Sequence, residues 1–263
     1  MVPYQVQVGK YARKRNVTIF IKEIRKNNIM LFLNQKKQSK NYSLNSDKSP
    51  IRTIKTAVMM HKTVGGFKGA IQWLSTSPEE RLRRFGERSW SSCHTINDRL
   101  ALGTIYQIIP FEYRAWHGGG VTRRPSRALD VIGVRDPNNV CIGHEFTAWY
   151  DFNRNNILEP TEKAATFQQL NDFVDFMFYL EEQSIDNPWL DIKADADHLL
   201  THSDTNHFKP DMEWEYEYVV DRMNNMRAFI KGPVEFKKIE EKKKNLMEII
   251  IKLLRLLIAK KNI

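Results

Sequence analysis

Short apolar runs with strand character alternate with helical stretches along most of this chain, and this alternation limits the folds that it can adopt. The runs with the character of buried strands lie at 51–60, 103–110 and 140–149. Helical spacing of apolar residues predicts helices at 67–74, 161–180 and 212–230. Such an order favours an α/β fold. We therefore predict a single mixed central β-sheet flanked by helices.

Charge divides the chain into three parts. Residues 1–50 hold eleven Lys/Arg against two Asp/Glu, and residues 231–263 hold ten against four, in a chain of net charge +10. The part between them is net −5. We predict a basic N-terminal extension at 1–50, a central domain at 51–230 and a basic amphipathic helix at 231–263. Cationic ends suit anionic polymers or surfaces, although they also serve simply to keep a chain soluble.

Both ends carry further local patterns. In the extension, the apolar runs 17–21 and 29–33 are predicted as short strands, and the polar stretch 34–50 as a linker. In the tail, residues 246–258 are nearly all apolar. As a helix they would span only about 20 Å, which is too short to cross a bilayer. Three uses stay open for this helix: binding at an anionic membrane or envelope surface, self-association, or docking on the body.

Two classes of protein are excluded by the cysteines and the N-terminus. Cys93 and Cys141 are the two cysteines, which is too few for a disulfide framework or a Cys-rich zinc module. The first twenty residues lack the charge and apolar pattern of a secretory signal. We therefore expect synthesis in the cytoplasm without a signal peptide.

Polar residues that bind metals gather at two places in the predicted domain. His61 follows a predicted buried strand, and His202 begins a dense polar segment, HSDTNHFKPD. Catalytic zinc takes three nitrogen, sulfur or oxygen ligands and leaves one position for water. His61, His202 and Asp211 would satisfy that count.

Glu145 is an unusual residue for its predicted strand, in the run CIGHEFTAW. A carboxylate in an apolar strand is costly to bury unless it is paired or functional. Strand alternation places His144 and Glu145 on opposite faces, so only one of them can face a site. The alternative is a glutamate of an edge strand that faces water.

Eight motifs follow one another in a recognisable order between about Lys55 and Met212. In sequence they are MMHKTVGGF, GAIQWLS, SSCHTIND, GTIYQIIP, RAWHGGG, DPNNVCIGHEF, a helix start at Pro-Thr-Glu, and HSDTNHFKPD. With these motifs the chain resembles the type 2 N-acetylmuramoyl-L-alanine amidases. That family includes many phage endolysins and is related to the peptidoglycan recognition proteins.

The resemblance implies a function and a set of site residues. It implies zinc-dependent hydrolysis of the amide bond between N-acetylmuramic acid and L-alanine in peptidoglycan, for bacterial lysis by a phage and therefore at the cell wall. It implies zinc held by His61, His202 and Asp211, with Glu145 acting on the attacking water and Lys209 facing the scissile carbonyl. The motifs that hold Trp116, His117 and His94 match segments that line the substrate groove or lie near the metal.

This chain departs from the family pattern at two positions. His144 stands where an apolar residue usually precedes the strand glutamate, and Cys93 stands where some members have a catalytic tyrosine. The aromatic residues Tyr106, Tyr113 and Trp116 suit either sugar stacking or ordinary core packing.

Two rival functions stay open. One is a cytosolic amidase that recycles soluble muropeptides, and the other is a peptidoglycan-binding module without catalysis. The expected partner is peptidoglycan or, for the recycling enzyme, the muropeptides released from it. No base-reading motif is visible, so no specific nucleic acid partner is expected.

Overall fold

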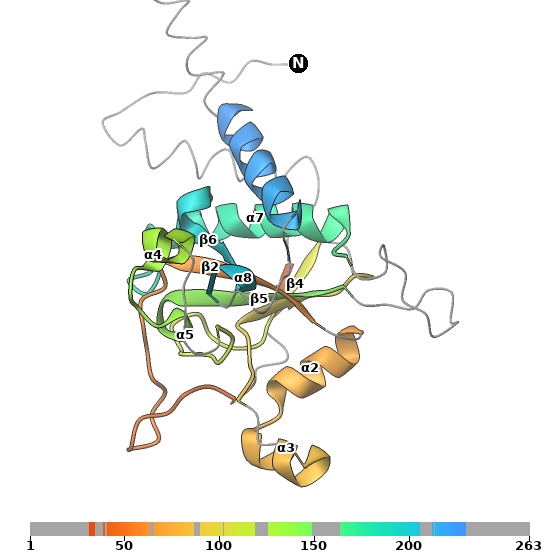
Figure 1. Ribbon diagram of the computed structural model, residues 1–263, viewed down its shortest axis with the longest axis vertical. Coiled ribbons are helices and arrows are strands. Elements are labelled where there is room, and N and C mark those ends of the chain that lie inside the picture. The colour runs from red at the N-terminus through yellow and green to blue at the C-terminus, as the bar shows by residue number, and fades with distance from the viewer. Residues whose placement is uncertain are drawn as a thin grey trace, which may run out of the picture. The chain divides into compact units, whose positions relative to one another are not determined.

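The computed structural model describes residues 32–34, 39, 41–63, 66–86, 90–101, 103–118, 126–148, 164–205, 212 and 214–229 (Figure 1). The chain divides into two compact units, 1–223 and 224–263. Of the second unit, the described part is 224–229, which is helical. The first unit contains the sheet and all the predicted site residues.

The described strands form one mixed sheet in the order β1-β4-β3-β5-β2-β6. Their bounds are β1 Phe32–Asn34, β2 Ala57–Thr63, β3 Thr95–Asn97, β4 Thr104–Gln107, β5 Cys141–Thr147 and β6 Leu199–Thr201. Only the β3–β4 pair is antiparallel among these strands, and β2 runs parallel between β5 and β6. The predicted α/β fold with a single mixed sheet is confirmed.

Helices lie on both faces of this sheet, as predicted. Their bounds are α2 Phe67–Ser75, α3 Pro78–Phe85, α4 Ser126–Ile132, α5 Pro137–Val140, α7 Phe167–Gln183, α8 His202–Thr205 and the short 3₁₀ turn η1 Ala196–His198. Residues 214–229 are also helical. Helix α7 crosses one face, and α2 and α5 lie on the other side (Figure 1).

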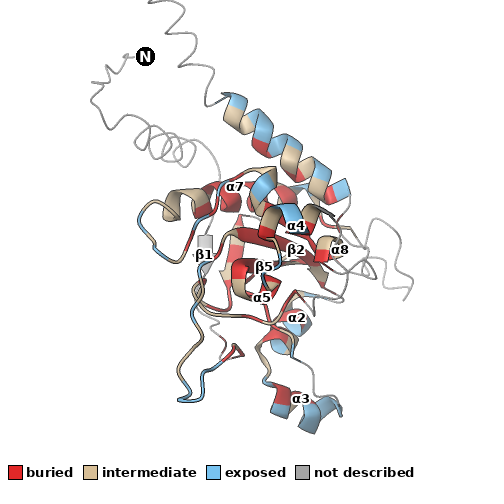
Figure 2. Cartoon of the chain, turned by 60° about the vertical axis from the view of Figure 1, so that its left-hand side comes forward, coloured by how far each residue is buried: buried red, intermediate tan, exposed pale blue. Residues whose placement is uncertain are grey.

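The two central strands pack differently on their two faces because side chains alternate along a strand. On the α7 face, Phe146 packs against Phe173, with ring centroids 5.3 Å apart. On the opposite face, Met59 and Cys141 join a core cluster with Ile132 of α4. Figure 2 shows the sheet as mostly buried, and α3 as largely exposed. This alternation decides which face of the sheet His61 and Glu145 occupy.

Strand β2 begins later than the sequence predicts. A strand was expected over 51–60 with His61 directly after it, but the strand runs from Ala57 to Thr63, so His61 lies inside it. Residues before it form only isolated bridges, such as Lys55 with Leu190. The side chain of Lys55 is fully buried, and its ammonium group donates to backbone carbonyls outside the sheet. These tertiary contacts replace a regular strand at 51–56.

Helix α7 also begins later than predicted. The start expected at Thr161 lies outside the described residues, and 164–166 are not helical. Thr166 is the N-cap, and its side chain and that of Gln169 form a reciprocal capping box. This box, rather than the upstream proline, sets the start of the helix.

Several expectations for the ends of the chain lie outside the described residues. These are the strand at 17–21, the helix at 231–263 and most of the strand at 29–33. The described part before residue 50 contacts the body: the Asn41 amide donates to the carbonyls of Leu74 and Ser91 at 3.1 and 2.8 Å. The domain boundaries stay predictions. Within the described part of the chain, no helix has the length and apolar character needed to cross a membrane.

Candidate active site

Two of the predicted metal ligands converge from neighbouring strands. His61 lies on β2, and His202 is the first residue of α8, directly after β6, which pairs with β2. Their Nδ1 atoms are 3.1 Å apart, and both side chains are buried. Parallel pairing of the strands brings together two histidines that are 141 residues apart in the sequence.

The position of His202 is fixed by its own short helix. Asp204 accepts hydrogen bonds from the backbone N–H and the hydroxyl of Thr201, at 2.7 and 2.9 Å. Arg127 of α4 lies 3.6 Å from the same carboxylate. This arrangement sets the turn between β6 and α8, at which His202 points toward His61.

Glu145 lies beside His61 in the sheet. The two residues are direct partners in the parallel β2–β5 register, so their side chains share a face. Glu145 is partly exposed, whereas His144 is fully buried on the other face, between Phe146 and Phe173. The charge of Glu145 also helps to raise the pKa of the buried Cys93 thiol, although burial is the larger cause.

His117 lies next to His61 on the same face. Its Nδ1 is 3.3 Å from His61 Nε2, and its Nε2 is 3.1 Å from the carbonyl oxygen of Cys141. The ring lies over Gly143, where an added Cβ would be 2.7 Å from Cδ2 of His117. Burial, together with the charge of Lys55, lowers the pKa of His117 to about 3, so the ring is neutral at neutral pH.

His94 is a second buried histidine on this face, and backbone groups engage both of its ring nitrogens. Nδ1 accepts from the N–H of Gly143 at 3.0 Å, and Nε2 lies 2.8 Å from the carbonyl oxygen of Tyr113. Burial lowers its pKa well below the usual range. Its predicted contact with substrate stays a prediction.

Helix α5 positions His117 through Asn138, which the sequence does not mark as a functional residue. The Asn138 side-chain oxygen accepts from the N–H groups of both His117 and Gly118, each at 2.8 Å. Gly118 packs tightly there, since an added Cβ would lie 2.6 Å from Pro137. The motif DPNNV indicates only the family resemblance. The sequence offers no signal for the role of Asn138, because only the fold brings the two N–H groups to its side chain.

The buried side chain of Lys55 holds α5 in place through hydrogen bonds. Its ammonium group donates to the carbonyl oxygen of Asn139 at 2.9 Å and to the hydroxyl of Thr53 at 2.8 Å. Burial lowers the pKa of Lys55 to about 7. Arg114 completes the support, donating to the side chains of Asn139 and Asp136 at 2.7 and 2.8 Å.

Trp116 packs against a second tryptophan, with the two rings tilted by 44°. Its ring centroid is 5.3 Å from that of Trp90, and the Arg114 guanidinium lies 3.9 Å from it. Trp90 is the exposed member, with 48% of its surface accessible. Tyr106 and Tyr113 pack against the hydrophobic core around α2. Their predicted roles in sugar stacking stay predictions.

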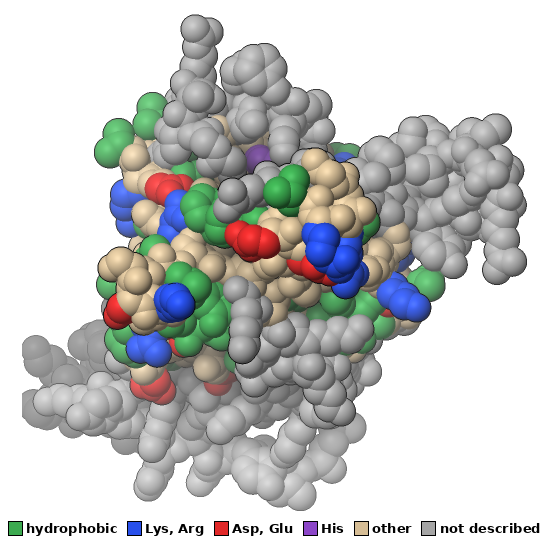
Figure 3. Space-filling view, turned by 90° about the horizontal axis from the view of Figure 1, so that it is seen from below, with side chains coloured by type: hydrophobic (Ala, Val, Ile, Leu, Met, Phe, Trp, Pro, Cys, Tyr) green, Lys and Arg blue, Asp and Glu red, His purple; other side chains and the backbone are tan. Residues whose placement is uncertain are grey.

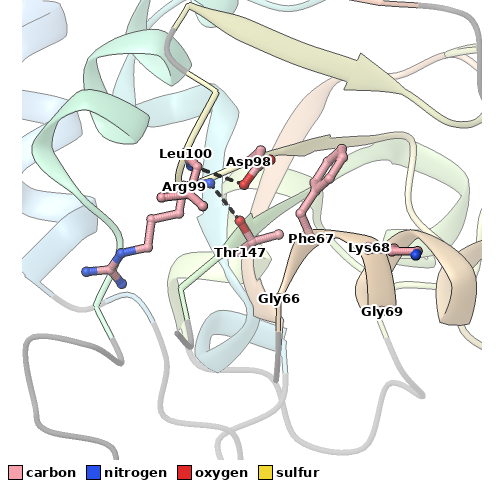
Figure 4. Close-up of a pocket in the computed structure, with 8 residues that line it drawn as sticks. All are labelled: Gly66, Phe67, Lys68, Gly69, Asp98, Arg99, Leu100 and Thr147. Carbon is pink, nitrogen blue, oxygen red and sulfur yellow. Dashed lines mark hydrogen bonds between the residues drawn. The ribbon is translucent and has the colours of Figure 1, made fainter. Parts of the chain in front are cut away.

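A pocket of about 320 Å³ opens at the carboxyl ends of β3 and β5 (Figure 4). Its lining residues are Gly66, Phe67, Lys68, Gly69, Asp98, Arg99, Leu100 and Thr147. Thr147 stands two residues beyond Glu145 on β5, which is roughly 7 Å along a strand. From the side of α2 and α3, the described surface mixes basic, acidic and hydrophobic side chains, with little histidine visible (Figure 3).

The described residues supply two of the three predicted metal ligands. Two ligands on a tetrahedral zinc ion at 2.0–2.1 Å would be about 3.3 Å apart. The observed 3.1 Å between the Nδ1 atoms of His61 and His202 fits that spacing. Asp211 and Lys209 lie outside the described residues, and the described ones alone contain no group of three or more potential ligands. Cys93 and Cys141 are both buried, and neither is part of a disulfide bond.

Comparison with known structures gives matches of low identity. A mutant endolysin from Bacillus subtilis is 14% identical, with 74% of this chain and 99% of that chain covered and a TM-score of 0.40. The Staphylococcus aureus hydrolase AmiA is 13% identical, with 84% and 93% covered and a TM-score of 0.41. The E. coli N-acetylmuramyl-L-alanine amidase AmiD, solved with anhydro-N-acetylmuramic acid-L-Ala-D-gamma-Glu-L-Lys, is 18% identical, with 65% and 56% covered and a TM-score of 0.38.

Comparison with known sequences gives a match to a family pattern but none to a curated protein. No curated protein sequence matches the chain. The sequence pattern of one family, described as N-acetylmuramoyl-L-alanine amidase, matches residues 50–212. This range contains every site residue named above and more than half of the chain. The chain therefore belongs to the N-acetylmuramoyl-L-alanine amidase family.

Proposed function

We propose that the chain is a zinc-dependent N-acetylmuramoyl-L-alanine amidase that acts on peptidoglycan. The observation that carries this proposal is the convergence of His61 and His202 through their Nδ1 atoms, with Glu145 as the strand neighbour of His61. Asp211 would supply the third ligand. Zinc held there would polarise the scissile carbonyl and lower the pKa of the attacking water.

Glu145 is the proposed general base. Its carboxylate accepts a proton from the attacking water as the new C–O bond forms at the lactyl carbonyl. When the C–N bond breaks, the same carboxyl group gives the proton to the amine of L-alanine. Partial exposure leaves Glu145 accessible to both water and substrate. Lys209 is proposed to stabilise the charge that develops on the carbonyl oxygen.

The substrate groove is proposed to run from His117 and the segment of Trp116 past the site to the pocket at the carboxyl ends of the strands. Glycan strands with stem peptides are long and polar, so a groove of mixed character suits them better than a closed apolar cavity. His94, buried next to His117, is proposed to shape the groove floor.

Replacing Glu145 by Gln tests this assignment. The variant keeps size and shape but cannot accept a proton, so cleavage of muramoyl-L-alanine should fall at least about 100-fold. Its zinc content, measured on the purified protein by atomic emission, should stay at the parental level. Glu217→Gln, on the exposed side of the helix at 214–229, is the matched control and should keep the parental rate.

Each outcome of that test decides something. Parental turnover by Glu145→Gln would remove the base assignment. A wild-type chain that holds zinc and binds sacculi without releasing L-alanine termini would instead be a peptidoglycan-binding module.

We propose phage lysis, rather than recycling, as the role of this activity. The support is the positive charge of both ends, because a small soluble substrate gives no use for it. Turbidity loss of intact sacculi, compared with cleavage of soluble muropeptide, separates the two roles. Faster action on the soluble substrate alone would favour recycling.

A further inference from the structure

His117 is placed between a backbone carbonyl and one of the proposed metal ligands. Its Nε2 lies 3.1 Å from the Cys141 carbonyl oxygen, and its Nδ1 lies 3.3 Å from Nε2 of His61. The two ring nitrogens of a histidine are not equivalent, because a neutral imidazole carries one N–H and one lone pair. The partner of one nitrogen therefore decides what the other nitrogen can do.

The carbonyl of Cys141 determines which ring nitrogens of His117 and His61 carry a hydrogen. A carbonyl oxygen only accepts hydrogen bonds, so the hydrogen of the His117 ring is on Nε2. Its Nδ1 is then an acceptor, and the hydrogen between the two rings belongs to Nε2 of His61. The lone pair of the His61 ring is left on Nδ1, which faces Nδ1 of His202 at 3.1 Å.

We propose that His117 is a positioning residue that holds His61 in the tautomer able to bind the metal through Nδ1. This inference rests on the zinc site proposed above and assigns His117 a role besides the groove contact expected from sequence. Ligands of metals are commonly oriented in this way by a partner on their second nitrogen. In the metal-free protein, the hydrogen between the two Nδ1 atoms then belongs to His202, so only His202 must change its tautomer when zinc binds.

The surroundings of His117 hold it in this place from three sides. Asn138 accepts from its backbone N–H, Gly143 leaves room for the ring, and Cys141 accepts from Nε2. Any buried histidine needs polar partners for its ring nitrogens, so the contact that distinguishes His117 is the one to His61. His94, its neighbour at 5.5 Å between centroids, has both nitrogens bound to backbone groups instead.

The first test is the tautomer itself, measured on the metal-free full-length chain. Two-bond correlations between ring nitrogens and carbon-bound protons in NMR identify which nitrogen carries the hydrogen. We expect Nε2–H for both His117 and His61. Nδ1–H on His61 would overturn the proposal, whether or not the protein binds zinc.

The second test is zinc affinity, measured by competition with a chelator. The amide oxygen of Asn falls near Nδ1 of histidine, whereas the amide of Gln falls near Nε2. His117→Gln should therefore weaken zinc binding about 10- to 100-fold, and His117→Asn, which restores an acceptor for His61, should weaken it less. His144→Gln buries the same amide on the opposite face and should keep the parental affinity.

The outcomes separate this inference from the proposed function. Parental zinc affinity in a folded His117→Gln protein would overturn the positioning role and leave the amidase proposal intact. A wild-type chain without zinc affinity would overturn the zinc site, and the tautomers would still be decided by NMR. If His117→Gln does not fold, His117→Asn is compared with the wild type instead. A loss of zinc affinity of about 100-fold or more in His117→Asn would then contradict the proposal.

Discussion

Strand β5 buries polar and apolar groups on its two faces in different ways. On the α7 face, the His144 ring is surrounded by Phe146, Phe173 and Phe176, with centroids 4.6, 4.7 and 5.7 Å away. On the other face, His117 lies over Gly143 with a polar partner at each ring nitrogen. Both histidines are buried, and burial lowers the pKa of each to about 3.

The contrast between these faces shows that burial of a histidine does not by itself mark a site. What differs is the origin of the contacts. His144 contacts aromatic side chains and one hydroxyl, that of Thr95 at 2.9 Å. His117 is held by backbone and side-chain groups from α5 and β5, which fix its orientation toward His61. A site is therefore recognised by polar groups that determine orientation, and variants on the two faces test this distinction.

Among these variants, the largest effect on zinc affinity is expected for Gly143→Ala. The added Cβ would lie 2.7 Å from Cδ2 and 2.9 Å from Cβ of His117, so the ring must move. Overpacking of this kind costs about 1–3 kcal/mol of unfolding free energy. Because the moved ring loses its contact with His61, zinc affinity should also fall at least about tenfold.

Phe146→Leu provides the matched control on the α7 face. Removing part of a buried ring should cost about 1–2 kcal/mol, similar to the first variant. Zinc affinity should nevertheless stay at the parental value. Denaturant unfolding and chelator competition measure both quantities, and equal zinc affinities in the two variants would show that the faces do not differ in the way described.

Much of this contrast could be predicted from the sequence, since strand alternation already placed His144 and Glu145 on opposite faces. The segments that carry His61, His202 and Glu145 were also identified, because they end or follow apolar runs. The role of Asn138 could not be predicted, since it depends on two backbone N–H groups that only the fold brings to its side chain. The same holds for His117, whose orientation depends on one backbone carbonyl.

Boundaries were less predictable for a related reason. Ile51 and Ile54 give residues 51–60 the composition of a strand, but the chain at Lys55 is engaged by residues 189–191 and by α5. Helix α7 begins where two side chains cap it, at Thr166 and Gln169, and not at the first proline upstream. Tertiary contacts and capping set these limits.

An effect on the pH dependence of stability is expected from Lys55→Met, which removes the buried charge beside α5. The pKa of Lys55 is about 7 in the folded chain, against an ordinary value of 10.5. Between those values the unfolded chain binds a proton that the folded chain does not, so this residue makes the unfolding free energy rise with pH. The unfolding free energy of the wild type minus that of the variant should therefore rise by up to about 1.4 kcal/mol per pH unit from about pH 7 to 10. Below pH 7 this difference should not change with pH.

Urea unfolding at pH 6, 7, 8 and 9 measures that difference. Lys193→Met, at an exposed lysine, should give a curve parallel to that of the wild type. A parallel curve for Lys55→Met as well would mean that the ammonium group is fully compensated by its carbonyl partners, and that the polar network under His117 carries no electrostatic cost.

The smallest effect is expected at Gly69 of α2, on the wall of the pocket. An added Cβ there meets no atom within 4 Å, so larger side chains are tolerated. Gly69→Ala should stabilise the helix by about 1 kcal/mol with little change in the pocket. Gly69→Leu should keep that gain in stability but place apolar bulk over the lining, and raise KM for muropeptide roughly fivefold, about 1 kcal/mol of binding. Zinc affinity should be unchanged in both variants, because α2 contributes no group to the contacts among His61, His117 and His202.

An unchanged KM for Gly69→Leu would place the substrate elsewhere on this face. A loss of zinc affinity would instead mean that the polar network extends to α2, and that the orienting contacts are less local than the comparison of the two faces of β5 implies.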